Sequence, residues 1–230
     1  MFLKMERKSD RFDELIKGEK YFFHFHTNFT DGKSSFEEYC NFAEKEGFRV
    51  LIVLEHVRKR LSYDFNRLIS VIQEQRRKRN LELLVGLEAK VLTDGSLDVD
   101  EIVLTMVDVV GIAEHSFSGD ANALSKALIK AFNMYKSERY ALVWVHPGTK
   151  LLKLENASMN LYTETIQAAK NLGVFIEHNL RYQLPPNDIL IKITRSSIIV
   201  GFDAHSIEDA ENLLKRARES AIFTKNDLSF

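Results

Sequence analysis

The sequence predicts a parallel α/β barrel, and three observations lead to this fold class. Hydrophobic runs of strand length alternate with helix-like segments between residues 21 and 219. They make up seven strand-helix units, an alternation typical of parallel strands joined by right-handed crossovers. Each histidine of the chain falls at or near the end of one of these hydrophobic runs. An open doubly wound sheet is the alternative architecture.

The first predicted strand covers residues 21–26 and has the sequence YFFHFH. Successive residues of a strand point to opposite sides, so we expect His24 and His26 to share one face and Phe23 and Phe25 the other. Two imidazoles on one face suit either a single cation or a hydrogen-bonded pair in the core.

The next segment, SSFEEYCNFAEKEG, predicts a helix. Two capping boxes are possible at its start, Ser34 with Glu37 or Ser35 with Glu38. Gly47 is a natural stop, because glycine readily takes the left-handed conformation that ends many helices.

The remaining elements repeat the alternation. RVLIVLEH is a continuous β-branched run of the kind found in parallel strands that are buried on both faces. The further predicted strands cover residues 49–56, 81–91, 108–115, 141–146, 174–179 and 197–205. The further predicted helices cover residues 62–79, 99–106, 121–137, 158–172, 187–194 and 206–219.

Length and composition predict one domain. We expect residues 1–19 to form a charged N-terminal leader or helix and residues 20–230 to form a single barrel domain. The formal net charge of −1 gives no field that would attract nucleic acid or an anionic membrane. No window is long and apolar enough for a signal peptide or a membrane span. The single cysteine, Cys40, excludes an internal disulfide, so we expect a cytoplasmic protein.

The histidines predict a metal centre. In a parallel barrel the carboxyl ends of the strands meet at one rim, where active sites of this architecture lie. A single histidine at a strand end is usually a core or loop residue, but many imidazoles buried together without a metal would be costly. The seven histidines are at positions 24, 26, 56, 115, 146, 178 and 205.

Carboxylates accompany these histidines. Asp31 follows the first pair, Glu88 ends the run VGLE, and Asp203 lies two residues before His205 and on the same face. Imidazole and carboxylate ligands without sulfur suit zinc, manganese or iron, or a mixture of them. About nine such ligands exceed the three or four protein ligands of one catalytic zinc, so the sequence predicts more than one metal ion.

An ordered series of motifs carries a family resemblance. The series is HFHTNFTDG, LEH, GLE, EHS, VHPG, EHN and FDAHS, from residue 24 to residue 206. Together these motifs resemble those of the PHP family, the polymerase and histidinol phosphatase domains. The resemblance implies a distorted seven-stranded TIM-like (β/α) barrel that holds three divalent ions and hydrolyses phosphoesters.

The resemblance also implies a ligand set, with Glu88, Asp203 and His205 in catalytic roles. The first ion would be held by His24, His26, Glu88 and Asp203. Glu88 would bridge to a second ion held with His115 and His146, and the third would be held by Asp31, His56 and His205.

Three positions depart from the family pattern. Glu55 stands where the family usually has Asp, and we expect it to orient His56 from outside the ligand set. Phe202 replaces a common serine, which changes packing more than chemistry. His178 replaces an aliphatic residue, and we expect it to face outward from the barrel in a structural role. Arg181, just past the same strand, is a candidate to bind the substrate phosphate.

The leading function is hydrolysis of a small phosphorylated metabolite, such as histidinol phosphate or a nucleotide, by a metal-activated hydroxide. The expected partner is a small molecule, and nucleic acid enters only as a short oligonucleotide substrate. Two alternatives remain open: an amidohydrolase-type metal hydrolase, which also begins with H-x-H, and a non-catalytic accessory PHP domain. The D-A-H motif at 203–205 argues against the first alternative, and retention of all nine ligands argues against the second.

Overall fold

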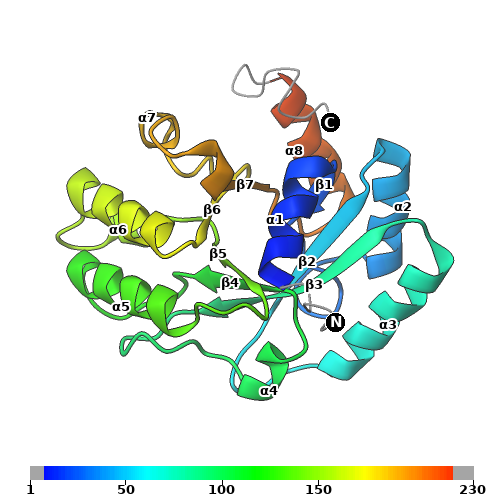
Figure 1. Cartoon of the computed structure of the whole chain (residues 1–230), viewed down its shortest axis with the longest axis horizontal. Helices are drawn as coiled ribbons and strands as arrows, with labels where there is room; N and C mark the ends of the chain where they lie inside the picture. The colour runs from blue at the N-terminus through cyan, green and yellow to red at the C-terminus, as the bar shows by residue number, and fades with distance from the viewer. Residues whose placement is uncertain (1–7, 220–230) are drawn as a thin grey trace, which may run out of the picture.

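The computed structural model describes residues 8–219, in which seven parallel strands form one sheet that closes into a barrel (Figure 1). Neighbouring strands pair in chain order. The strands are β1 (Tyr21–Phe23), β2 (Val50–His56), β3 (Glu82–Lys90), β4 (Val109–Ala113), β5 (Ala141–Trp144), β6 (Phe175–Asn179) and β7 (Ile198–Gly201). The predicted barrel is therefore confirmed, and the open doubly wound sheet is wrong.

Helices surround the strands on the outside of the barrel (Figure 1). Residues 1–7 of the predicted leader and residues 220–230 lie outside the described part of the chain. The helices are α1 (Lys8–Gly18), α2 (Phe36–Glu46), α3 (Phe65–Lys78), α4 (Glu101–Leu104), α5 (Ala121–Met134), α6 (Met159–Asn171), α7 (Asn187–Leu190) and α8 (Ile207–Glu219). Two short 3₁₀ helices are η1 (Leu151–Lys153) and η2 (Arg195–Ser197).

The seam between β1 and β7 is made by residues just beyond both strands. Phe25 pairs with Ala204 in a parallel bridge. The N–H of His26 donates to the carbonyl of Ala204 at 2.8 Å, and the N–H of Ala204 donates to the carbonyl of His24 at 3.2 Å. Two histidines of the first motif are thereby fixed against the last strand.

Several strands are shorter than the sequence predicts, and the reason lies in the backbone. β1 ends at Phe23, because His24 has φ 66°, and β5 ends before His146, which has φ 31°. The predicted alternation at the first strand is accordingly wrong at Phe23. Phe23 packs among the residues inside the barrel, whereas Phe25 packs in the outer core under the helices.

The half of the barrel interior near the N-terminal ends of the strands is apolar. Its buried side chains come from alternate strand positions, among them Ile52, Leu84 and Val143. Helix α1 crosses the N-terminal ends of the strands and adds Phe12 and Ile16 to this core (Figure 1). The apolar interior supports the polar residues at the opposite end, which we call the barrel mouth.

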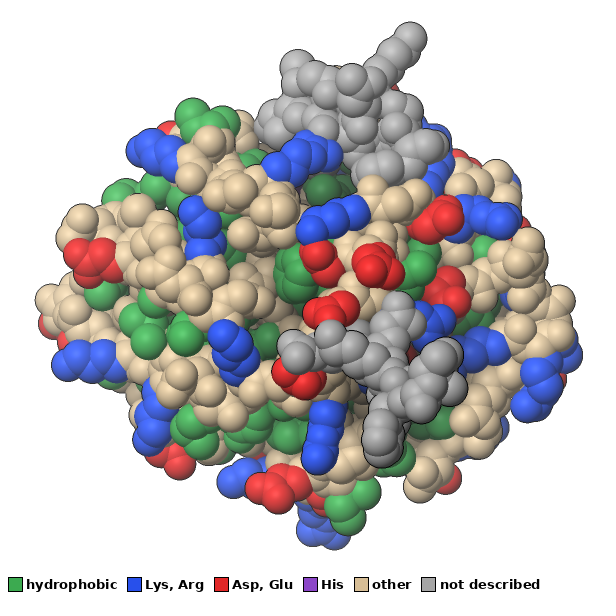
Figure 2. All heavy atoms as spheres, viewed as in Figure 1, with side chains coloured by type: hydrophobic (Ala, Val, Ile, Leu, Met, Phe, Trp, Pro, Cys, Tyr) green, Lys and Arg blue, Asp and Glu red, His purple; other side chains and the backbone are tan. Residues whose placement is uncertain are grey.

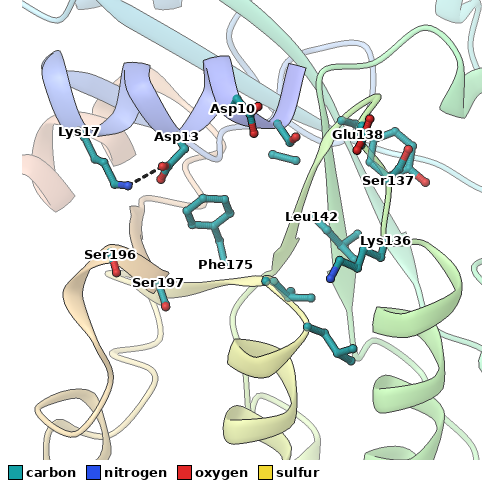
Figure 3. Close-up of a pocket in the computed structure, with 16 residues that line it drawn as sticks. Asp10, Asp13, Lys17, Lys136, Ser137, Glu138, Leu142, Phe175, Ser196 and Ser197 are labelled. Carbon is teal, nitrogen blue, oxygen red and sulfur yellow. Dashed lines mark hydrogen bonds and ion pairs between the residues drawn. The ribbon is translucent and has the colours of Figure 1, made fainter. Parts of the chain in front are cut away.

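A pocket of about 580 Å³ lies beside α1, at the starts of β5 and β6 (Figure 3). Asp13 and Lys17 of α1 form an ion pair at 2.5 Å on one wall, and Phe175 and Leu142 lie on the other. Because this pocket lies at the N-terminal ends of the strands, it is remote from the predicted histidine cluster.

The face seen in Figure 1 is a charged surface of mixed sign (Figure 2). Outside the area that grey atoms cover, none of the described histidines is visible on it. This agrees with a histidine cluster at the other end of the barrel. Among residues 8–219, no helix combines the length and the hydrophobicity that a membrane crossing requires.

Candidate metal centre

Nine side chains that the sequence predicts as ligands come together at the barrel mouth, although they come from segments up to 181 positions apart. Each is within 4 Å of at least one other member of the group. We call this group the metal cluster; its members are His24, His26, Asp31, His56, Glu88, His115, His146, Asp203 and His205.

Glu88 lies at the centre of the metal cluster, near the end of β3, and is 1% exposed. Its Oε2 lies 3.0 Å from Nε2 of His24. Its Oε1 lies 2.8 Å from Nε2 of His115 and 3.3 Å from Nε2 of His146. One carboxylate thus faces imidazoles from both sides, the arrangement that a bridging ligand requires.

Asp203 and Asp31 lie next to the remaining histidines of the metal cluster. Oδ1 of Asp203 lies 3.3 Å from Nε2 of His26. Oδ2 of Asp31 lies 3.3 Å from Nε2 of His56 and 3.5 Å from Nε2 of His205. The partners of Asp31 are those that the family resemblance implies for the third ion.

The donor atoms suit metal ions. Three groups of three ligand atoms have all members within 4.8 Å of one another: His24, Glu88 and His146; His24, His26 and Asp203; and His26, His56 and His205. Among the described residues, both ring nitrogens of His26 and Nδ1 of His56 are buried without a hydrogen-bond partner. A buried polar atom without a partner is costly, and a coordinated cation would remove that cost. The residues therefore fit a polynuclear site.

The charges in the buried half of the metal cluster stabilise one another. Burial by itself raises the pKa of Glu88 and lowers that of His146, but their mutual attraction outweighs it. The pKa of Glu88 is held well below its ordinary value, and that of His146 is raised. Burial acts on Asp203 in the same way, and the nearby His24 reverses the effect and lowers its pKa to about 2. His26 is different, because burial dominates and lowers its pKa to about 4.

In the solvent-facing half of the metal cluster, carboxylate and imidazole charges also stabilise one another. Hydrogen bonds from His205 and His56 lower the pKa of Asp31. Burial lowers the pKa of each of these two histidines, but Asp31 outweighs it, and both pKa values are raised. The three carboxylates of the metal cluster are therefore ionised at neutral pH, the form that binds a cation.

Three members of the metal cluster have left-handed backbones: His24 at φ 66°, His146 at φ 31° and Asp203 at φ 53°. Non-glycine residues rarely adopt this region, and such strain concentrates at functional sites. In each case the left-handed residue comes where the strand has ended, and its side chain turns into the barrel mouth.

Glu177 on β6 is a carboxylate behind the metal cluster and is fully buried. Its Oε1 lies 2.6 Å from Nδ1 of His24, and its Oε2 accepts the backbone N–H of His146. The amide of Asn179 donates to the same Oε2 at 3.1 Å. Gly201 leaves room for this carboxylate, because a Cβ at that position would overlap it. The contact of Glu177 with Nδ1 of His24 leaves Nε2 of that ring to face the metal cluster.

The substitution of Glu for Asp at position 55 has a clear structural role. Its Oε1 accepts the N–H of Thr27 at 2.9 Å and also the Thr27 hydroxyl, and its Oε2 accepts the hydroxyl of Thr30. Burial raises the pKa of Glu55 to about 7. The longer side chain thus ties down the loop that carries Asp31, an effect that the sequence did not predict.

Glu114 is a second buried carboxylate that the sequence did not single out. It accepts the Nε1–H of Trp144 at 2.9 Å and the N–H of Gly148 at 2.7 Å. It also accepts the N–H groups of Lys150 and Leu151, both at 2.8 Å. These bonds fix the loop after His146. Only its position next to His115 could have drawn attention to Glu114 in the sequence.

His178 and Arg181 are the two remaining residues that the sequence singles out. His178 alternates with Glu177 along β6 and belongs to none of the three donor groups. Burial lowers its pKa. Arg181 donates from Nε to the carbonyl of Asp203 at 2.7 Å and from Nη2 to Asp209. Its guanidinium therefore lies beside the metal cluster, already bonded to the loop that carries Asp203.

Comparisons with known proteins place this geometry in a family. The PHP domain model matches residues 23–222. Over 93% of this chain, the sequence is 24% identical to the DNA polymerase/3′-5′ exonuclease PolX of Bacillus subtilis. The match spans 39% of that protein, so the chain corresponds to about two-fifths of its relative's length.

Solved structures share the fold. A histidinol phosphate phosphatase from Lactococcus lactis, crystallised with zinc, L-histidinol and phosphate, aligns with a TM-score of 0.60 and 17% identity over 86% of this chain and 93% of that one. A two-domain Bacteroides vulgatus protein, described as containing a predicted PHP-like metal-dependent phosphoesterase, aligns at 0.51 and 17% identity, over 86% of this chain and 55% of that one. An amidohydrolase aligns at 0.54, with 10% identity and 91% and 95% coverage. With a family match over most of its length, the chain belongs to the PHP domain family.

Proposed function

We propose that this chain is a metal-dependent phosphoesterase that acts at the barrel mouth. The observation that carries the proposal is the metal cluster itself: six imidazoles and three carboxylates converge there. Family membership supports the same reaction class. The cluster would hold three divalent ions, of zinc, manganese or iron, in the sets given above.

Glu88 and Glu177 have different roles in the proposed reaction. Glu88 lies between the imidazoles of His24 and His115 and would bridge the first and second ions. When bound, the ions supply Lewis acidity, which makes water a nucleophile near neutral pH and offsets charge on the phosphoryl oxygens. Glu177 holds Nδ1 of His24 and the backbone of His146, so the ring of His24 stays oriented toward the cluster.

Exposure indicates the direction from which substrate approaches. His24, His26 and Glu88 are buried, whereas the side chains of His115 and Asp31 are 36% and 55% exposed. The exposed edge also has Tyr182, whose ring lies 5.9 Å from that of His146. We place the scissile phosphate at this edge.

Small phosphomonoesters are the substrate class that we favour. The histidinol phosphate phosphatase that shares the fold was crystallised with a small alcohol and phosphate. Phosphodiester hydrolysis at an oligonucleotide end is the second candidate, because the curated relative is named as a polymerase and 3′-5′ exonuclease. Amide hydrolysis ranks below both, since the amidohydrolase match rests on fold at 10% identity.

Hydrolysis of p-nitrophenyl phosphate and bis(p-nitrophenyl) phosphate tests this proposal. We expect phosphoester turnover that a chelator abolishes and that added Mn²⁺ or Zn²⁺ restores. A His205→Ala variant should lose this activity, and His178→Ala is the matched histidine control. Turnover of amides without turnover of either phosphoester would overturn the proposal.

A further inference from the structure

A second pocket, of about 410 Å³, lies at the ends of β3 and β4. Its wall is rich in lysine and hydroxyl side chains, an apt lining for an anion. The lining residues that matter here are Lys59, Lys90, Thr93, Asp94, Ser116 and Ser118.

The pocket is adjacent to the metal cluster. Lys90 follows Glu88 by two positions on β3, so both side chains lie on the same face of the strand, about 7 Å apart along it. Ser116 directly follows His115, another member of the metal cluster. A ligand in this pocket would therefore be next to a phosphate bound at the metal cluster.

The charges of the pocket favour an anion. Lys90 pairs with Asp98 at 3.5 Å, and Asp98 is shared with Nε of Arg58 at 3.7 Å and with the backbone N–H of Lys59 at 3.0 Å. Arg58 and Asp98 are not among the lining residues and carry opposite charges, so the cations of the lining itself are Lys59 and Lys90.

Asp94 is the carboxylate of the lining. Its Oδ1 accepts the N–H of Ser96 at 2.9 Å and the Ser96 hydroxyl at 2.7 Å. Among the lining residues, the two lysines Lys59 and Lys90 thus outnumber the single carboxylate, Asp94. The Lys90 side chain is 26% exposed, and partial burial strengthens its attraction for an anion.

We propose that this pocket binds a second phosphoryl group of the substrate. The inference rests on the proposed function and narrows it to phosphoesters that carry a second phosphoryl group beside the one that is hydrolysed. Lys90 is the main contact, and the hydroxyls of Ser116 and Ser118 complete it. Two sources have this chemistry: a bisphosphorylated metabolite and the neighbouring phosphate of an oligonucleotide.

Matched substrate pairs test the proposal. Fructose 1,6-bisphosphate is compared with fructose 6-phosphate, and a 5′-phosphorylated thymidine dinucleotide with its unphosphorylated form. We expect kcat/KM to be about tenfold or more higher for the member of one pair that carries the additional phosphoryl group. Lys90→Gln should abolish this preference and Lys90→Arg should retain it. The matched control is Lys78→Gln, an exposed lysine at the far end of α3.

Calorimetry on chelator-treated protein provides a readout without turnover. In the pair that shows the preference, the wild type should bind the ligand with the additional phosphoryl group more tightly than the other member, and Lys90→Gln should bind the two alike. The pair that shows the preference identifies the source. Hydrolysis of single phosphoesters with no preference in either pair would overturn this inference alone, whereas no hydrolysis of any phosphoester would overturn the proposed function as well.

Discussion

Glu88 and Glu177 are both buried glutamates in the barrel interior, but they have different roles. Glu88 faces the open centre of the metal cluster, where its two oxygens are each near an imidazole. Glu177 faces the rear of the same histidines, and its oxygens are saturated by His24, His146 and Asn179. The first is placed to bind metal and the second to position the groups that bind it.

A Glu177→Gln substitution tests the positioning role. The amide oxygen can accept from only one side, so either Nδ1 of His24 or the backbone N–H of His146 loses its acceptor. We expect metal affinity to fall about 10–100-fold, as measured by competition with a chromogenic chelator. The ¹⁵N shifts of the His24 ring should report a changed tautomer population.

Gly201→Ala probes the same contact from the opposite side, because the added methyl group would displace the Glu177 carboxylate. Glu164→Gln on α6, which removes an exposed glutamate, is the control for both variants. Wild-type metal affinity and unchanged His24 shifts in Glu177→Gln would show that Glu177 only fills space.

At the residue scale, the sequence indicated neighbouring side chains where their spacing along the chain was sufficient. Their two-residue interval predicted that Asp203 and His205 share one face, and the structure brings both side chains into the metal cluster. The contact between His24 and Glu177 joins residues 153 positions apart, and the positive φ of His24 breaks the alternation that the prediction assumed. Neither property is encoded in a local pattern.

At the scale of elements, the start of α2 shows why two sequence patterns could not be separated. The structure has the capping box of Ser35 with Glu38, and Gly47 ends the helix at φ 75°. Ser34 has another role, because its hydroxyl accepts the N–H of Ile207 at 3.1 Å, at the start of α8. The choice between the boxes thus depends on a helix that follows about 170 residues later.

Helix α1 is an element whose contribution to stability can be measured. Phe12 is 1% exposed, contacts Phe175 at a ring distance of 5.2 Å and closes the N-terminal end of the barrel. We expect Phe12→Ala to lower the free energy of unfolding by about 3–5 kcal/mol, as measured by urea denaturation.

The control for this variant is Glu14→Ala, an exposed position on the same helix, which should change stability by less than about 0.5 kcal/mol. A loss from Phe12→Ala no larger than that of the control would mean that α1 rests on the barrel without stabilising it.

At the scale of the whole molecule, the alternating pattern predicted parallel strands joined by helices, and the seven units favoured a barrel over the open doubly wound sheet, which has the same alternation. Right-handed crossovers place each strand next to the one before it, which gives the observed strand order. Because the strands are parallel, their carboxyl ends all lie at the same rim. The sequence therefore predicted that distant histidines would meet. It did not predict how the mouth is shaped, because the loops that carry Asp31 and Arg181 are fixed by contacts with other segments.

The central claim is that the barrel mouth gathers these side chains in order to bind several metal ions. Elemental analysis by mass spectrometry, on protein expressed with ample zinc, manganese and iron, tests it most directly. We predict about three divalent ions per wild-type chain, fewer in His205→Ala and the wild-type number in His178→Ala. One ion or none per wild-type chain would contradict the account.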